Sequence, residues 1–186
     1  MRTGLPPEIK RMILRILLVV LALIAVIIIY AAAKPSTFHG ERSVTIEASP
    51  EKVFPLINDL HNWPRWAPQD REDPTMKRTF AGAESGTGAT SDWSGSGDTG
   101  KGRMAITESI SPKAVTVAVD WERPFAVRNL NEFHLEPDGS DTRVTWSMSG
   151  PNVFVMKLMS VFTNMDERMG QHFERGLHNL KTIAQQ

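Results

Sequence analysis

The sequence predicts an α+β domain, in which an antiparallel sheet is joined to a long C-terminal helix, preceded by one transmembrane helix. Three patterns carry this prediction: an uncharged apolar run at residues 16–33, period-two alternation through most of residues 76–149, and helical periodicity after residue 164. At 186 residues, the chain has room for one domain and a membrane segment.

Residues 16–33, ILLVVLALIAVIIIYAAA, reach the roughly 18 apolar residues that cross a bilayer as a helix. A buried core helix would normally show a polar stripe, which is missing here. A cleaved signal peptide is a second alternative, although the run exceeds the roughly 7–15 apolar residues usual for such a segment. Four basic residues and one glutamate lie in the flank at residues 1–15, so we expect a cytoplasmic N-terminus and a domain outside the cytoplasm.

Residues 34–41 are predicted to be a tether, and residues 42–186 the folded domain. The domain begins with an alternating strand at residues 43–48. Ser49 and Pro50 then suit a helix start, while Pro55 predicts that this helix is short or kinked. HNWPRWAP, at residues 61–68, is interpreted as a turn carrying Trp63 and Trp66.

Six further strands are predicted at residues 76–81, 88–94, 103–111, 114–122, 127–136 and 142–149. GSGDTGKG, at residues 95–102, comes close to a phosphate-binding loop, but Gly102 stands where a Ser or Thr is needed. Alternating residues lie on both sides and no helical pattern follows. The stretch is therefore predicted to be a hairpin loop, and no nucleotide is expected.

The last segment has apolar residues at spacings of three and four, from Met165 and Met169 to Ile183, with charged residues between them. This pattern predicts a long amphipathic helix. The apolar stretch at residues 152–162 is expected to form a shorter helix before it.

The segments PEKVFPLINDLHNWPRWAP, GTGATSDWSG, ITESISP and NEFHLEPDGSDTRVTWSMSG, together with the terminal MDERMGQHFERGLHNLK, resemble the SRPBCC, or START-like, superfamily. Within it, the chain is most similar to the polyketide cyclase/dehydrase branch. The resemblance spans about residues 42–184 and implies a helix-grip (Bet v 1/START-like) fold, in which a curved antiparallel sheet wraps the terminal helix around a cavity for an apolar molecule. It carries over no catalytic motif.

Strand parity predicts which side chains face that cavity, because alternate residues of a strand share a face. The predicted inward residues include Asn129, Asn131, Met148 and, on the strand at residues 103–111, Glu108, which has the parity of Met104 and Ile106. A carboxylate among apolar neighbours would be a polar anchor or an acid/base group, or would lie at the rim of the sheet with a polar partner. The candidate ligand-binding residues are Trp93, Glu108, Val117, Trp121, Asn131, Phe133, Trp146, Met165 and Met169, with Glu108 as the candidate catalytic group.

Composition and motifs argue against several other functions. The chain has no cysteine, and its five histidines have no metal-ligand spacing, so no metal and no cofactor are expected. Basic and acidic residues are equal in number, which does not favour a nucleic-acid partner.

Three functions remain open from the sequence. The first is a membrane-anchored domain that binds a hydrophobic small molecule such as a lipid, a quinone or a polyketide-like compound. The second is a polyketide cyclase or dehydratase-like enzyme. The third is a structural or interaction module whose interior is filled by its own side chains.

Overall fold

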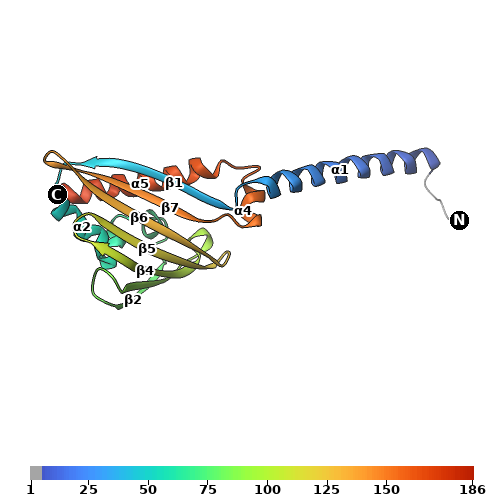
Figure 1. Ribbon diagram of the computed structural model, residues 1–186. Helices are drawn as coiled ribbons and strands as arrows, with labels where there is room; N and C mark the ends of the chain where they lie inside the picture. The colour runs from blue at the N-terminus through green and yellow to red at the C-terminus, as the bar shows by residue number, and fades with distance from the viewer. Residues whose placement is uncertain (1–5) are drawn as a thin grey trace. The chain divides into compact units, whose positions relative to one another are not determined.

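The computed structural model describes residues 6–186, so Arg2 of the predicted basic flank lies outside the described part. The chain forms two compact units (Figure 1). One contains the residues up to Ser36 together with Asn152–Asn164, and the other contains Thr37–Pro151 and Met165–Gln186. The segment at residues 152–164 therefore belongs with the apolar N-terminal helix, although the sequence had placed it in the domain at residues 42–186.

The larger unit is built on one antiparallel sheet. Its strands are β1 (Thr37–Ile46), β2 (Lys77–Gly82), β3 (Ala89–Ser94), β4 (Lys101–Ile110), β5 (Ala114–Arg123), β6 (Val127–Asp138) and β7 (Asp141–Pro151). The strand order is β1-β7-β6-β5-β4-β3-β2. All seven predicted strands are present. β1 begins at Thr37, where it pairs with Pro151 of β7, so most of the predicted tether at residues 34–41 is strand.

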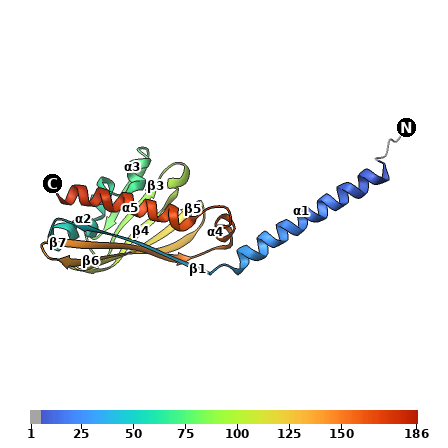
Figure 2. The same ribbon diagram turned by 90° about the horizontal axis from the view of Figure 1, so that it is seen from above.

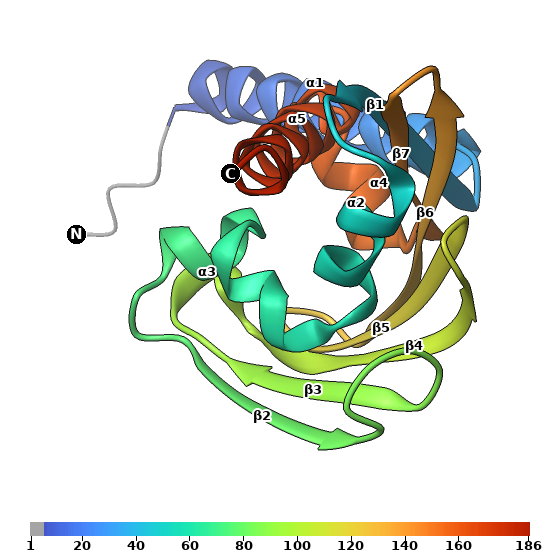
Figure 3. The same cartoon turned by 90° about the vertical axis from the view of Figure 1, so that its left-hand side faces the viewer.

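Helix α5 (Met165–Ala184) lies along the concave side of this curved sheet (Figures 2 and 3). Its apolar face buries Phe173, Leu177 and Leu180, each at most 2% exposed. Gly176 lets the helix approach the sheet closely, because a β-carbon there would lie 2.6 Å from a ring carbon of Trp146. The predicted α+β, helix-grip fold class is confirmed.

Three short helices close one end of the concave side: α2 (Pro50–Asn58), η1 (Leu60–Arg65) and α3 (Pro68–Glu72). Helix α2 contains Pro55 and is short, as predicted. The segment predicted to be a turn is instead the 3-10 helix η1 followed by the start of α3. The indole N–H groups of Trp63 and Trp66 donate to backbone carbonyls at the end of α2, each over 2.9 Å. These bonds hold η1 and the residue after it against α2.

The GSGDTGKG stretch joins β3 to β4, and the prediction of a hairpin loop is confirmed. Gly97 and Gly100 have φ angles of 51° and 60°, which favour glycine. At Gly100 a side chain would also collide with the carbonyl oxygen of Arg123.

The smaller unit consists of α1 (Pro7–Ala33) and α4 (Phe154–Met159), which pack against each other. Helix α1 is long and apolar enough to cross a membrane, a property that signal sequences share. Most of its large apolar side chains are exposed, and Ala31 near its end is fully buried. Residues 152–162 were expected to contain a short helix, and α4 confirms this.

Candidate functional site

The concave face of the sheet carries most of the residues predicted to face a cavity. Five of them are buried, and these are Trp93, Val117, Asn131, Phe133 and Trp146. Trp121, Met165 and Met169 are only partly buried. The parity predictions for β5, β6 and β7 agree with the burial of these strands, because most of the residues predicted to face inward are buried.

The inward position predicted for Glu108 is wrong: its side chain is exposed. β4 has a bulge, in which Ile106 pairs with Val117 and Glu108 pairs with Thr116, so that Thr107 is an extra residue. An extra residue reverses the side-chain alternation beyond it. Ser109 therefore takes the inward direction, and its hydroxyl donates to Oδ1 of Asn58 on α2 over 2.7 Å.

Aromatic rings fill the end of the concave face that lies beneath α2 and η1. Trp146 is at the centre of this cluster, with ring-centroid distances of 5.1 Å to Phe133, 4.7 Å to Phe173 and 5.7 Å to Trp66. Trp63 completes the cluster at 4.9 Å from Trp66. This part of the interior is packed by the chain's own side chains.

Two asparagines stand in a row on the inward face of β6 and have different surroundings. Oδ1 of Asn131 accepts the indole N–H of Trp146 over 2.9 Å, so this amide positions the aromatic cluster. Oδ1 of Asn129 is buried and accepts no hydrogen bond from any described residue. Its Nδ2 has only a weak contact, 3.9 Å to the sulfur of Met148. If the amide were flipped so that its oxygen and nitrogen exchanged places, the group would still lack a strong hydrogen-bond partner.

The side chains near Asn129 are partly buried and include flexible ones, unlike the packed rings of the aromatic cluster. Trp121 lies two positions from the residue opposite Asn129 on β5, on the same face of the sheet, because Val119 pairs with Asn129 and Trp121 with Val127. Met148 and Met169 are partly buried. A β-carbon at Gly40 would collide with the terminal methyl of Met169, so that side chain lies against β1. Flexible thioethers can rearrange around an irregular apolar molecule.

Asn129 was among the inward residues predicted from parity but not among the candidate ligand-binding residues. Both asparagines have the same parity, and no sequence signal indicates which one the Trp146 indole would use. The pairing is set by the positions of β6 and β7 in the folded sheet. Asn129 is therefore a site residue that sequence reasoning missed.

His172 on α5 is a titratable group beside the aromatic cluster, with its ring centroid 5.8 Å from that of Trp146. Burial lowers the pKa of this imidazole below its ordinary value of 6.5, and the positive charge of Arg175 acts in the same direction. The carboxylate of Glu72 opposes both effects. His172 is thus held toward its neutral form at the surface of the cluster.

A cleft of about 600 Å³ lies between α3 and α5, and none of the predicted site residues lines it. Polar bridges cross from one helix to the other: Arg175 Nη1 lies 3.1 Å from Glu72 Oε1, and Arg71 Nη1 donates to Asn179 Oδ1 over 3.0 Å. Pro68, which also lines the cleft, would touch a β-carbon placed on Gly176, so the cleft ends where α5 rests on Trp146. Among the described residues, no group of three His, Asp or Glu side chains could hold a metal ion.

The family comparison agrees with this geometry. The model of the family described as polyketide cyclase / dehydrase and lipid transport matches residues 37–185. The chain belongs to this family. The match covers the whole sheet and α5, and it starts at the first residue of β1. None of the curated proteins matches the sequence.

Solved structures with a similar fold come from a plant and from bacteria. Major latex-like protein 151 from Panax ginseng has a TM-score of 0.60 at 14% identity, covering 81% of this chain and 99% of that one. A protein from Thermus thermophilus has a TM-score of 0.59 at 16% identity, covering 79% and 97%. A protein from Arthrobacter aurescens has a TM-score of 0.54 at 20% identity, covering 79% and 87%. At these identities the likeness establishes the fold.

Proposed function

We propose that this member of the polyketide cyclase and lipid transport family is a membrane-anchored protein that binds one hydrophobic small molecule between the sheet and α5. The molecule would be a lipid, a quinone or a polyketide-like compound. The observation that carries the proposal is the buried amide of Asn129, whose oxygen has no hydrogen-bond partner among the described residues. The family's description, which includes lipid transport, supports the same class of molecule.

The amide explains why an apolar molecule with one polar group would be favoured. A buried acceptor left without a donor costs about 1–3 kcal/mol. A hydroxyl or N–H group of the bound molecule would remove that cost, while Trp121, Met148 and Met169 contact its apolar part. The anchor contributes by holding the binding domain beside a reservoir of apolar molecules. In this proposal α1 crosses the membrane with its N-terminus in the cytoplasm and the domain on the other side.

The enzymatic alternative has lost its candidate acid/base group. Glu108 was the one carboxylate that parity placed inside, and the bulge puts it on the exposed side of β4. His172 lies beside the aromatic cluster, with its ring centroid 5.8 Å from that of Trp146 and 6.3 Å from that of Phe173.

An interaction module without a bound molecule is the second candidate, and the aromatic cluster favours it. Trp146, Phe133 and Trp66 leave little of that half of the interior for another molecule, and Trp93 packs against Trp121 with ring centroids 5.0 Å apart. The two candidates therefore differ in what the Asn129 end of the concave face contains.

The test uses the full chain purified in a mild detergent and titrated with a panel containing a long-chain fatty alcohol, a quinol and an aromatic polyketide. Asn129→Leu keeps a similar volume and removes the amide. One hydrogen bond contributes about 0.5–1.5 kcal/mol, so the variant should bind the preferred compound roughly 2–10-fold more weakly. Glu108→Gln is the matched control and should bind as the wild type does. Absence of binding across the panel, with both variants folded, would favour the interaction module.

A further inference from the structure

The smaller unit has an exposed apolar surface apart from α1. We propose that α4 and the turn after it form a second membrane contact, in which Phe154, Val155, Met159 and Phe162 lie in the interfacial region of the bilayer beside the end of α1. This inference rests on the proposed membrane anchor and goes beyond it, because it assigns a lipid-facing role to a segment more than 100 residues away in the sequence.

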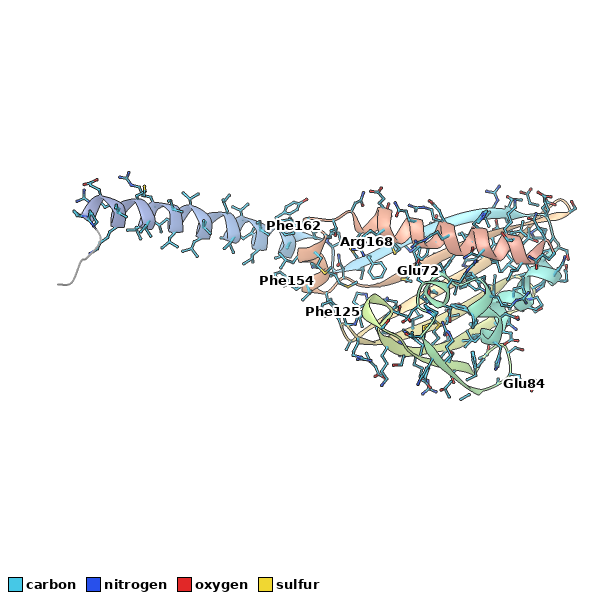
Figure 4. The ribbon with its side chains drawn as sticks, turned by 180° about the vertical axis from the view of Figure 1, so that it is seen from behind. Glu72, Glu84, Phe125, Phe154, Phe162 and Arg168 are labelled. Carbon is cyan, nitrogen blue, oxygen red and sulfur yellow. The ribbon has the colours of Figure 1, made fainter. Side chains whose placement is uncertain are left out.

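The four side chains are large, apolar and open to solvent. Phe154, Val155 and Met159 are 48%, 42% and 44% exposed, and Phe162 is 71% exposed. At about 100° per residue, the three residues within α4 fall inside roughly 140° of the helix circumference and form a single face. The two phenylalanines lie at the end of α1 (Figure 4). Contiguous exposed apolar surface of this kind marks a contact with a partner or a membrane.

Hydrogen bonds hold both ends of the α4 segment to the residues that directly follow α1. On the N-terminal side, the backbone N–H of Asn152 donates to the carbonyl of Ser36 over 2.7 Å, and its side-chain Nδ2 donates to the carbonyl of Pro35 over 3.1 Å. On the C-terminal side, Nζ of Lys34 donates to the carbonyl and the hydroxyl of Ser160 over 2.7 and 2.8 Å. The segment is therefore fixed at the level of Lys34.

The length of the apolar run sets that level in a membrane. Residues 16–33 form about 27 Å of helix, close to the roughly 30 Å of a bilayer's hydrocarbon core. Lys34, the first charged residue after the run, would then lie at the boundary of the core, with its Nζ 5.3 Å from the centre of the Tyr30 ring. Tyrosine and lysine are both suited to this boundary, since each combines an apolar body with a polar tip.

The short length of α4 keeps it in the same layer. Six residues of helix extend about 9 Å, and the polar region on each side of the core is roughly 5–8 Å thick. Because both ends of the segment are hydrogen-bonded to residues 34–36, most of α4 stays within the interfacial region while α1 is inserted. At this depth, the exposed apolar side chains of the segment would contact lipid.

The test exploits the absence of cysteine from the chain. Single-cysteine variants of the full chain, Phe154→Cys and Phe162→Cys, are labelled with a nitrobenzoxadiazole fluorophore and reconstituted into vesicles of phosphatidylcholine and phosphatidylglycerol. Quenching is measured with lipids that carry a nitroxide near the headgroup or deep in the acyl chain, and with aqueous iodide. Ile24→Cys, in the middle of the apolar run, and Ser140→Cys, in the exposed turn between β6 and β7, are the controls.

We expect the shallow nitroxide to quench both phenylalanine-site labels at least several-fold more than it quenches the Ser140 label, and the deep nitroxide to quench the Ile24 label most. Labels at residues 154 and 162 that iodide quenches as strongly as the Ser140 label would overturn the second contact and leave the anchor standing. A blue-shifted emission without lipid quenching would also overturn it, in favour of a protein partner. Failure of lipid quenching at Ile24 would overturn the anchor itself.

Discussion

The two glycines inside α5 offer the same substitution in the same helix with opposite expected results. Gly170 faces the guanidinium of Arg42, and Gly176 faces the indole of Trp146 and the ring of Pro68. Replacing a helical glycine with alanine contributes about 1 kcal/mol of stability through backbone propensity at either position. The difference between the two variants therefore measures what the new β-carbon meets.

At Gly170 the neighbour can move. The Arg42 side chain is 32% exposed, and its carboxylate partners Glu174 and Asp166, at 3.1 and 3.7 Å, are 62% and 70% exposed, so these surface pairs are worth about 0–1 kcal/mol. Losing them would about cancel the propensity gain. Gly170→Ala should therefore change stability by between zero and about 1 kcal/mol in the stabilising direction.

At Gly176 the neighbour cannot move. Trp146 is 3% exposed, it is enclosed by Phe133, Phe173 and Trp66, and its N–H is bound to Asn131. A β-carbon 2.6 Å from its ring forces α5 away from the sheet, and overpacking of this kind costs about 1–3 kcal/mol. After the propensity gain, Gly176→Ala should be destabilised by up to about 2 kcal/mol.

The assay is thermal unfolding of the full chain in detergent, followed by near-ultraviolet circular dichroism of the tryptophans. For a chain of this size, each kcal/mol moves the Tm by about 2–4 °C. The two variants differ by up to about 3 kcal/mol, so Gly170→Ala should melt up to roughly 12 °C above Gly176→Ala. A Gly176→Ala variant that melts above Gly170→Ala would refute the close packing of α5 on Trp146.

Three further outcomes are expected. In urea unfolding, Asp70→Asn should lose about 3–5 kcal/mol, because it leaves Arg78 unpaired where both side chains are 6% exposed; a loss below about 1 kcal/mol would contradict burial of that pair. Burial lowers the pKa of His172 below 6.5, so the stability that the neutral imidazole contributes is complete above pH 6.5 and falls as the pH drops below 6.5. His172→Gln should flatten the stability curve below pH 6.5, and an unchanged curve would contradict this. A reporter fused after Gln186 should be extracytoplasmic, and activity confined to the cytoplasm would reverse the proposed orientation.

Much of the fold could be predicted from the sequence because local pattern and tertiary structure agree in most elements. Alternation identified the inward faces of β5, β6 and β7, and the spacing of Met165, Met169 and Phe173 identified α5. The first residues of β1 were missed, because TFHGER does not alternate and becomes strand by pairing with β7. The 3-10 helix η1 was missed because it is stabilised by indole hydrogen bonds to α2.

The candidate site was less predictable, since it depends on contacts between distant segments. Parity failed at Glu108 because the bulge at Thr107 arises where β4 meets other elements: the carbonyl of Ile106 accepts from Gly88, and Ser109 binds Asn58. Asn129 has the amide without a strong partner because the indole of Trp146 binds Asn131 instead. Neither contact can be recognised from the residues next to it in the sequence.

The central claim is that the Asn129 end of the interior holds one hydrophobic molecule. Native mass spectrometry of the full chain, released from detergent and followed by organic extraction, tests it most directly. We predict a species heavier than the bare chain by the mass of a single apolar molecule, with a smaller bound fraction in Asn129→Leu and an unchanged one in Glu108→Gln. A wild-type chain that shows only its bare mass, even after incubation with the lipid, quinol and polyketide panel, would contradict the claim.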